Sequence, residues 1–131
     1  MPVALDHLII RSRDKRASAA FLAEMLGLPP PSVVGPGGRF HAIRLAGGTS
    51  LDFADAGEPF EPQHYAFAVS DPELDALLAR LRERRIAYWA DPGQTQPDQV
   101  ADRGGGTRAV YFADPSGHWL EVLTRASDRP N

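Results

Sequence analysis

The sequence contains no cysteine and a single lysine, Lys15, among its 131 residues. The absence of cysteine excludes disulfides, thiolate metal ligands and a cysteine nucleophile in this chain. Basic side chains number 14 against 17 acidic ones, a net charge of −3, so the chain lacks the basic excess that nucleic-acid binding favours. We therefore expect a small molecule as partner, and no nucleic acid.

Long apolar runs are also missing. No run approaches the roughly 18–20 residues that span a bilayer, and the segment MPVALDHLII has no basic region ahead of a long apolar stretch. These absences predict a cytoplasmic protein with no membrane partner and no secretory signal. Apolar residues still make up 43% of the chain, enough for the core of one domain or of two half-domains that share it.

The first half of the sequence is typical of a strand, a helix and further strands. The apolar run Val3–Ile10 is rich in β-branched residues and predicts a strand. A helix is expected between Asp14, which caps its first amides, and Gly27, which ends it. Two strands follow at Arg39–Leu45 and Thr49–Ala54, and a Gly-Gly pair between them indicates a hairpin turn.

The second half repeats this order. Gln63–Val69 predicts a strand, and Ser70 with Glu73 has the spacing of a capping box at a helix start. The leucines that follow recur at helical spacing, which predicts an amphipathic helix. The other expected elements are a short strand at Ile86–Trp89, a polar glycine-rich loop at Pro92–Gly106, and a hairpin of Arg108–Ala113 and His118–Thr124.

Four polar residues interrupt these apolar strands in matching places. His7 and His64 lie 57 positions apart (64 − 7), and Asp52 and Glu121 lie 69 apart (121 − 52). Because side chains alternate along a strand, all four point away from the face that packs on the helices. Chance similarity between short apolar strands is the alternative explanation of this repeat.

A carboxylate on a buried strand needs a proton or a cation beside it. Two neutral imidazoles and one carboxylate form the triad that binds divalent iron, manganese or zinc and leaves positions open for substrate. His7, His64 and Glu121 are therefore candidate metal ligands. In the competing interpretation each histidine is a core residue bonded to a neighbour, and Glu121 pairs with an arginine.

Other candidates lie on the closing strands. Tyr111 and Arg108 have opposite parity on one strand, so at most one of them faces the same side as Glu121. Trp89 and Trp119 offer aromatic surface for a ring-bearing substrate, although core packing also accounts for such residues. The loop Pro92–Gly106 fits either a lid or a plain flexible connection.

Three segments of the chain resemble the vicinal oxygen chelate superfamily: LDHLIIRSRDKRASAAFLAEMLGL, QHYAFAVSDPELDALLARLRERRI and VYFADPSGHWLEVL. This superfamily includes glyoxalase I, extradiol dioxygenases, fosfomycin-resistance enzymes and bleomycin-resistance proteins. The resemblance implies an α+β fold of two βαβββ modules in tandem, residues 1–57 and 58–131, whose curved mixed sheets form one compact domain around a cavity. The metal positions of the family match His7, His64 and Glu121.

Three features depart from the family pattern. Asp52 stands where glyoxalases carry Glu or Gln, and its shorter side chain suits a water bridge or a proton-transfer role better than direct ligation. Ile9 stands where fosfomycin transferases carry a Thr, and the lysine of those enzymes has no counterpart because Lys15 is the sole lysine. We expect Ile9, Trp89, Trp119 and Arg108 to contact substrate, and Asp52 and Tyr111 to act in catalysis.

The resemblance implies an enzyme that depends on a divalent metal (Fe, Mn, Zn or Ni) and acts on a small oxygen-bearing substrate. Its reaction would be that of a lyase, a dioxygenase or a transferase. A metal-free protein that sequesters a drug or metabolite, as bleomycin-resistance proteins do, is the alternative. Family members of this size usually pair, which predicts a homodimer in which His7 of one chain joins His64 and Glu121 of the other.

Overall fold

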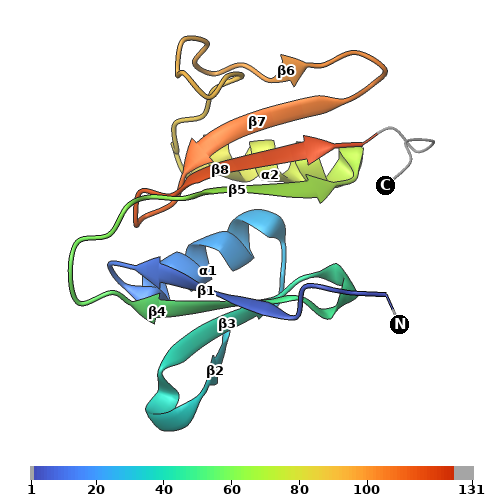
Figure 1. The fold of residues 1–131 in the computed structure, drawn as a ribbon. Coiled ribbons are helices and arrows are strands. Elements are labelled where there is room, and N and C mark those ends of the chain that lie inside the picture. Colours follow the sequence, from blue (N-terminus) through green and yellow to red (C-terminus); the bar gives the residue numbers. More distant parts are fainter. Residues whose placement is uncertain (1, 126–131) are drawn as a thin grey trace. The chain divides into compact units, whose positions relative to one another are not determined.

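The structure is a computed structural model that describes residues 2–125. The chain divides into two compact units, Met1–Glu61 and Pro62–Asn131. Each unit contains one helix and one four-stranded mixed sheet (Figure 1), so the predicted α+β fold of two tandem modules is confirmed. Residues 126–131 of the predicted second module lie outside the described residues. No helix within residues 2–125 is long and apolar enough to cross a membrane.

The first unit contains the strands and helix β1 (His7–Ser12), α1 (Lys15–Leu26), β2 (Ser32–Val34), β3 (Phe40–Arg44) and β4 (Ser50–Asp55). Its sheet has the order β1-β4-β3-β2, and β1 runs parallel to β4 while the other pairs are antiparallel. Two single 3₁₀ turns, Pro36–Gly38 and Ala46–Gly48, precede β3 and β4.

The second unit repeats this topology with β5 (His64–Val69), α2 (Asp71–Glu83), β6 (Ala101–Asp102), β7 (Arg108–Ala113) and β8 (Trp119–Thr124). Its sheet has the order β5-β8-β7-β6, with β5 parallel to β8 and the other pairs antiparallel. Both units are therefore βαβββ modules.

The helix ends form where the sequence predicts them. The side chain of Asp14 accepts a hydrogen bond from the Ala17 amide at 3.1 Å, and Gly27 ends α1 with a φ of 68°, a left-handed conformation that glycine adopts without strain. At the start of α2, the Ser70 hydroxyl accepts from the Glu73 amide while the Glu73 carboxylate accepts from the Ser70 amide. This reciprocal capping box satisfies two amides that no helical carbonyl reaches.

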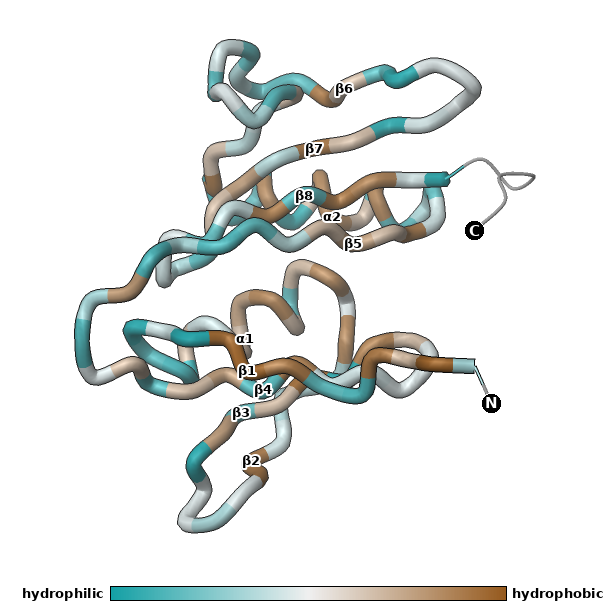
Figure 2. The backbone as a smooth tube through the Cα atoms, viewed as in Figure 1, coloured by the Kyte–Doolittle hydropathy of each residue, from teal (hydrophilic) through white to brown (hydrophobic). Residues whose placement is uncertain are grey.

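Alternation along the strands separates a core face from an open face in each unit. In the first unit Ile10, Leu51 and Phe53 are buried, and in the second Leu120 and Val122 are buried. Each set faces its own helix, and Figure 2 shows hydrophobic stretches along β1 and β8 that end in hydrophilic residues. The polar residues His7, Asp52, His64 and Glu121 are therefore left on the opposite faces, as alternation predicted.

Four details of the predicted elements were wrong. Residues 86–89 form no strand, because Trp89 alone makes bridges, to Pro97 and Tyr111, and Arg85 turns the chain with a φ of 55°. The predicted loop at 92–106 contains β6, and β2 follows a proline run from which no strand was expected. The first strand begins and ends later than Val3–Ile10, because β1 pairs with β4 as far as Ser12.

Candidate functional site

The register of β5 and β8 brings His64 and Glu121 together. The two strands are parallel neighbours, and Ala66, two residues after His64, lies opposite Glu121. Side chains two apart share a face, so both groups project from the same side of the sheet. The Nε2 atom of His64 lies 3.2 Å from the Oε1 atom of Glu121.

The hydrogen bonds of His64 fix which of its nitrogens faces the carboxylate. Its Nδ1 lies 2.9 Å from the carbonyl oxygen of Trp119, and a carbonyl oxygen can only accept, so Nδ1 carries a hydrogen. In the neutral imidazole the Nε2 lone pair is then directed at Glu121. A lone pair and a carboxylate oxygen repel unless a proton or a metal ion lies between them, so this donor pair fits either a shared proton or a divalent cation.

Glu121 also has a cationic partner, Arg103, which sequence reasoning did not identify. The Nη1 of Arg103 lies 2.8 Å from Glu121 Oε2, and the guanidinium donates a second hydrogen bond to the Tyr111 hydroxyl. Only 11% of the Glu121 side chain is exposed, against 37% for Arg103. The expectation that an arginine could neutralise Glu121 is therefore met by a residue just before the Gly104–Gly106 turn.

Tyr111 is held beside this ion pair by strand register. It lies opposite Glu121 in the β7–β8 ladder. Burial raises the pKa of Tyr111, and the charge of Glu121 adds to the rise, so the phenol remains protonated at neutral pH. Tyr111 therefore offers a hydroxyl hydrogen next to the carboxylate, and its predicted part in catalysis stays a prediction.

Aromatic rings extend from the His64–Glu121 pair in a row. The rings of His64 and Tyr111 are stacked at 6.4 Å, those of Tyr111 and Trp119 at 6.3 Å, and Trp89 lies 5.4 Å from Trp119. The Nε1 of Trp119 is buried and has no hydrogen-bond partner within residues 2–125. The structure thus brings both predicted aromatic substrate contacts to the candidate site.

The first unit holds the matching residues in the same register. Ile9, two residues after His7, lies opposite Asp52 in the parallel pair β1 and β4. The Ser50 hydroxyl donates to Asp52 Oδ1 at 2.6 Å. His7 Nδ1 lies 2.7 Å from a carboxylate oxygen of Asp6, and this hydrogen bond raises the pKa of His7. As in His64, Nδ1 is bound to oxygen and Nε2 remains for another ligand.

A cavity of 490 Å³ opens in the first unit, and its lining includes His7, Ser50, Asp52 and Arg44. Ile9 on β1 is exposed but does not belong to the lining of this cavity. Within residues 2–125, the structure has no group of three or more His, Asp or Glu side chains that could hold a metal ion. Each unit contains one histidine and one acid of the predicted set.

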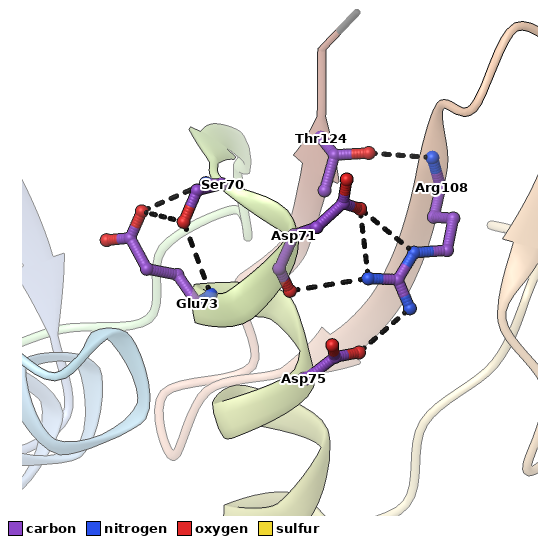
Figure 3. A network of polar contacts seen from close by, with 6 residues as sticks. All are labelled: Ser70, Asp71, Glu73, Asp75, Arg108 and Thr124. Carbon is purple, nitrogen blue, oxygen red and sulfur yellow. Dashed lines mark hydrogen bonds and ion pairs between the residues drawn. The ribbon is translucent and has the colours of Figure 1, made fainter.

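Arg108, the remaining predicted substrate contact, lies elsewhere. Its guanidinium donates to the Asp71 carboxylate at 3.0 and 3.2 Å and to the Asp75 carboxylate at 3.0 Å, both on α2 (Figure 3). Its backbone amide donates to the Thr124 hydroxyl. Because side chains alternate along β7, Arg108 lies on the face of the sheet that packs on α2, and Tyr111 lies on the face that carries Glu121. The structure therefore does not bring Arg108 to the His64–Glu121 pair.

Residues 4–122 match the profile of the glyoxalase/bleomycin resistance protein/dioxygenase superfamily. The chain belongs to this superfamily. Among solved structures, "Oxidase ChaP-H1" is similar to it with 43% identity and a TM-score of 0.89, over 98% of this chain and 100% of that one. "Glutathione transferase FosA" of Serratia marcescens is 28% identical over 124 residues, 91% of this chain and 79% of the relative.

"Metallothiol transferase FosB" of Shouchella clausii (strain KSM-K16) is 39% identical over 61 residues, which span 47% of this chain and 37% of that relative. The chain therefore resembles one named oxidase over 98% of its own length and two named transferases over 79% and 37% of theirs. These relatives carry names of enzymes.

Proposed function

We propose that this protein is a divalent-metal-dependent oxidase that acts on a small substrate with vicinal oxygen atoms. The observation that carries the proposal is the facing pair of His64 Nε2 and Glu121 Oε1, 3.2 Å apart. The 43% identity with an oxidase over 98% of the chain favours oxidation over thiol transfer, because the identity with the glutathione transferase is 28% over 91% of the chain.

The proposed metal ligands are His64, Glu121 and His7, the last from the same chain or from a second copy. The donor chemistry fits Fe, Mn, Zn or Ni, because both imidazoles bind oxygen through Nδ1 and leave Nε2 for a metal. A bound divalent ion would hold the substrate's oxygens and stabilise the negative charge that develops on them. Asp52 would act as a base or through a bridging water, and Tyr111 as a proton donor.

The aromatic row of the second unit supports a substrate with a planar ring. The rings of Tyr111 and Trp119 are stacked, and Trp89 lies next to Trp119. Ile9 would add an apolar contact. The substrate class that follows is a hydroxylated aromatic compound, with dioxygen as the electron acceptor.

We also propose a homodimer. Large apolar side chains of the first unit, among them Leu5, Ile9 and Val33, are exposed on β1, β2 and the segment before β1. Light scattering on the purified protein measures the mass directly. A monomer at micromolar concentration would contradict the dimer. The proposed metal ligands would then all have to come from one chain.

Metal content tests the proposed function. Protein purified without chelator is analysed for Fe, Mn, Zn and Ni and then titrated with Co²⁺ after the metal is removed. We expect one ion per chain and an affinity that falls about a hundredfold or more in His64→Ala and Glu121→Gln, because each loses a ligand. His41→Ala is the matched control, since His41 lies on β3 outside the candidate set. Absence of metal, with equal Co²⁺ affinity in His64→Ala, would refute the proposal.

Activity assays separate the reaction classes. Oxygen consumption by the metal-loaded protein is measured with a panel of hydroxylated aromatic compounds, and glutathione consumption is measured with fosfomycin. The proposal expects the first and not the second. Thiol consumption with no oxygen uptake would assign the chain to the transferases instead.

A metal-free binding protein is the second candidate, and the Arg103–Glu121 ion pair favours it. This pair at 2.8 Å neutralises the buried carboxylate without a metal. In that case His64→Ala would leave the affinity for an aromatic ligand unchanged. Both tryptophans lie beside the site, so their fluorescence reports ligand binding in either case.

A further inference from the structure

We propose that Arg103 is a substrate-binding residue for an anionic oxygen, held by Glu121 in the metal-free chain and released when that carboxylate binds the metal. This inference rests on the proposed function. It adds Arg103 to the substrate-binding residues and a negative charge to the expected substrate. It concerns a side chain that the family resemblance did not assign.

The guanidinium of Arg103 is placed between two groups of the candidate site. One nitrogen lies 2.8 Å from Glu121 Oε2, another donates to the Tyr111 hydroxyl, and the guanidinium carbon lies 5.8 Å from the Tyr111 ring centre. A guanidinium has five N–H donors, so these two contacts leave three of them for other acceptors. With 37% of the side chain exposed, a ligand that enters the site has access to them.

The two oxygens of Glu121 have different neighbours. Oε1 faces His64 and Oε2 faces Arg103, so the carboxylate is shared between the proposed metal position and the arginine. In the metal-free chain the charges of Glu121 and Arg103 cancel. A divalent ion on Glu121 raises the sum of the ion, the carboxylate and the arginine to about +2, and that charge is partly buried.

A substrate that supplies negative charge restores the balance. An ionised phenol or enol with a neighbouring oxygen would place one oxygen on the metal and another within reach of the arginine. The substrate class is thereby narrowed from an oxygen-bearing compound to one that binds as an anion. Tyr111, which shares the guanidinium, would remain at the side of the bound oxygen.

The backbone around Arg103 is fixed, so release needs only the side chain to move. The Arg103 amide donates to the Thr107 carbonyl at 2.8 Å, and the Thr107 amide donates to the Gly104 carbonyl at 3.0 Å. The Asp102 carboxylate accepts from the Gly104 amide at 2.9 Å. These bonds hold the tight turn after β6 while the long side chain reorients about its own torsions.

Metal affinity is the first readout. Apo protein is titrated with Co²⁺ alone and followed by visible absorption, for the parent chain, Arg103→Met and Arg103→Lys. Because a hydrogen bond to a charged group contributes about 1.5–3 kcal/mol, we expect Arg103→Met to bind Co²⁺ about tenfold more tightly, with Arg103→Lys in between.

Arg82→Met is the matched control. Arg82 also pairs with a tyrosine in the second unit, with its Nε 3.0 Å from the Tyr88 hydroxyl and its guanidinium carbon 5.9 Å from that ring. Within residues 2–125, Arg82 forms no ion pair with a carboxylate. Arg82→Met should therefore leave Co²⁺ affinity as in the parent chain.

Anion affinity is the second readout and should change in the opposite direction. Nitrocatechol, whose absorption reports ionisation and chelation, is titrated into each Co²⁺-loaded protein. We expect Arg103→Met to bind it about tenfold more weakly than the parent and Arg82→Met to match the parent. A purely structural arginine would lower both affinities or neither.

The outcomes separate this inference from the proposed function. Should the parent chain bind no Co²⁺, both fall together. If the parent chain and Arg103→Met bind Co²⁺ with equal affinity, the role of Arg103 is refuted while the metal site stands. The same conclusion follows if these two proteins bind nitrocatechol equally. Circular dichroism of each variant confirms that the fold is retained.

Discussion

Replacing Arg108 with alanine tests whether this arginine holds the fold or serves a ligand. The side chain donates to the Asp71 carboxylate through Nε and Nη2, to the Asp71 carbonyl at 3.3 Å, and to Asp75 through Nη1 (Figure 3). These contacts join β7 to the first turns of α2. Both aspartates raise the pKa of Arg108, so its charge persists at any ordinary pH.

The expected loss of stability is modest because the network is exposed. The side chains of Asp71 and Asp75 are 61% and 65% exposed, and that of Arg108 is 31% exposed. Exposed ion pairs contribute about 0.2–1 kcal/mol each, and the bond to the Asp71 carbonyl adds a similar amount. We therefore expect Arg108→Ala to cost about 1–2 kcal/mol and to lower Tm by about 4–8 °C.

Thermal unfolding followed by circular dichroism measures the loss, and salt checks its origin. In roughly 1 M NaCl, where the screening length falls to about 3 Å, the difference between Arg108→Ala and the parent should shrink. In a double-mutant cycle with Asp75→Ala, the coupling should be about 0.5–1 kcal/mol. Co²⁺ and nitrocatechol affinities should stay as in the parent. An unchanged Tm with weakened ligand binding would refute the structural role and restore the substrate contact predicted from sequence.

Two further changes test the α2 helix. Ser70→Ala removes the hydroxyl that caps α2 and should cost about 1 kcal/mol at neutral pH. Ser70 lowers the pKa of Glu73, so the stability gained from this contact is present above the unfolded-state pKa of Glu73 and is lost as pH falls through the lower folded-state pKa. The difference in unfolding free energy between the parent and Ser70→Ala, measured by denaturation across acidic pH, should therefore shrink as pH falls. Leu77→Ala, at a side chain only 1% exposed, should cost about 2–5 kcal/mol in urea unfolding; a cost below about 1 kcal/mol would contradict the packing of α2 on its sheet.

Local signals predicted the helices, because their information lies within a few residues. Asp14 and Gly27 bound α1, and Ser70 and Glu73 start α2, where the sequence indicated. A cap or a left-handed glycine works through neighbouring amides and needs no distant partner.

Strand limits depend on partners far along the chain, and there the sequence was less informative. β6 is two residues long and exists through its pairing with β7, and β2 pairs with β3 while all three of its residues are exposed. Such edge strands carry no alternating pattern that distinguishes them from loop. The segment at 86–89 has the composition of a strand, yet no neighbouring strand pairs along it.

Only part of the candidate site was predicted, because some of its contacts also depend on partners far along the chain. Alternation alone put His64 and Glu121 on the open face of the second sheet, and parity separated Tyr111 from Arg108. Arg103 could not be found this way, because its approach to Glu121 depends on the hairpin that follows β6. A sequence signal would have required the register of β6 against β7, which two residues do not specify.

The two units have the same strand register but differ in the size of the residues around the polar pair. The residue opposite the histidine is Ser50 in the first unit and Trp119 in the second. The residue opposite the acid is Ala42 in the first unit and Tyr111 in the second. Small side chains leave a 490 Å³ cavity in the first unit, whereas in the second the rings stack beside the carboxylate. Packing alone favours apolar residues on a strand, since a buried carboxylate must be compensated. A histidine and an acid at one register in both units, amid neighbours of different size, therefore support the ligand role that we propose for the pair.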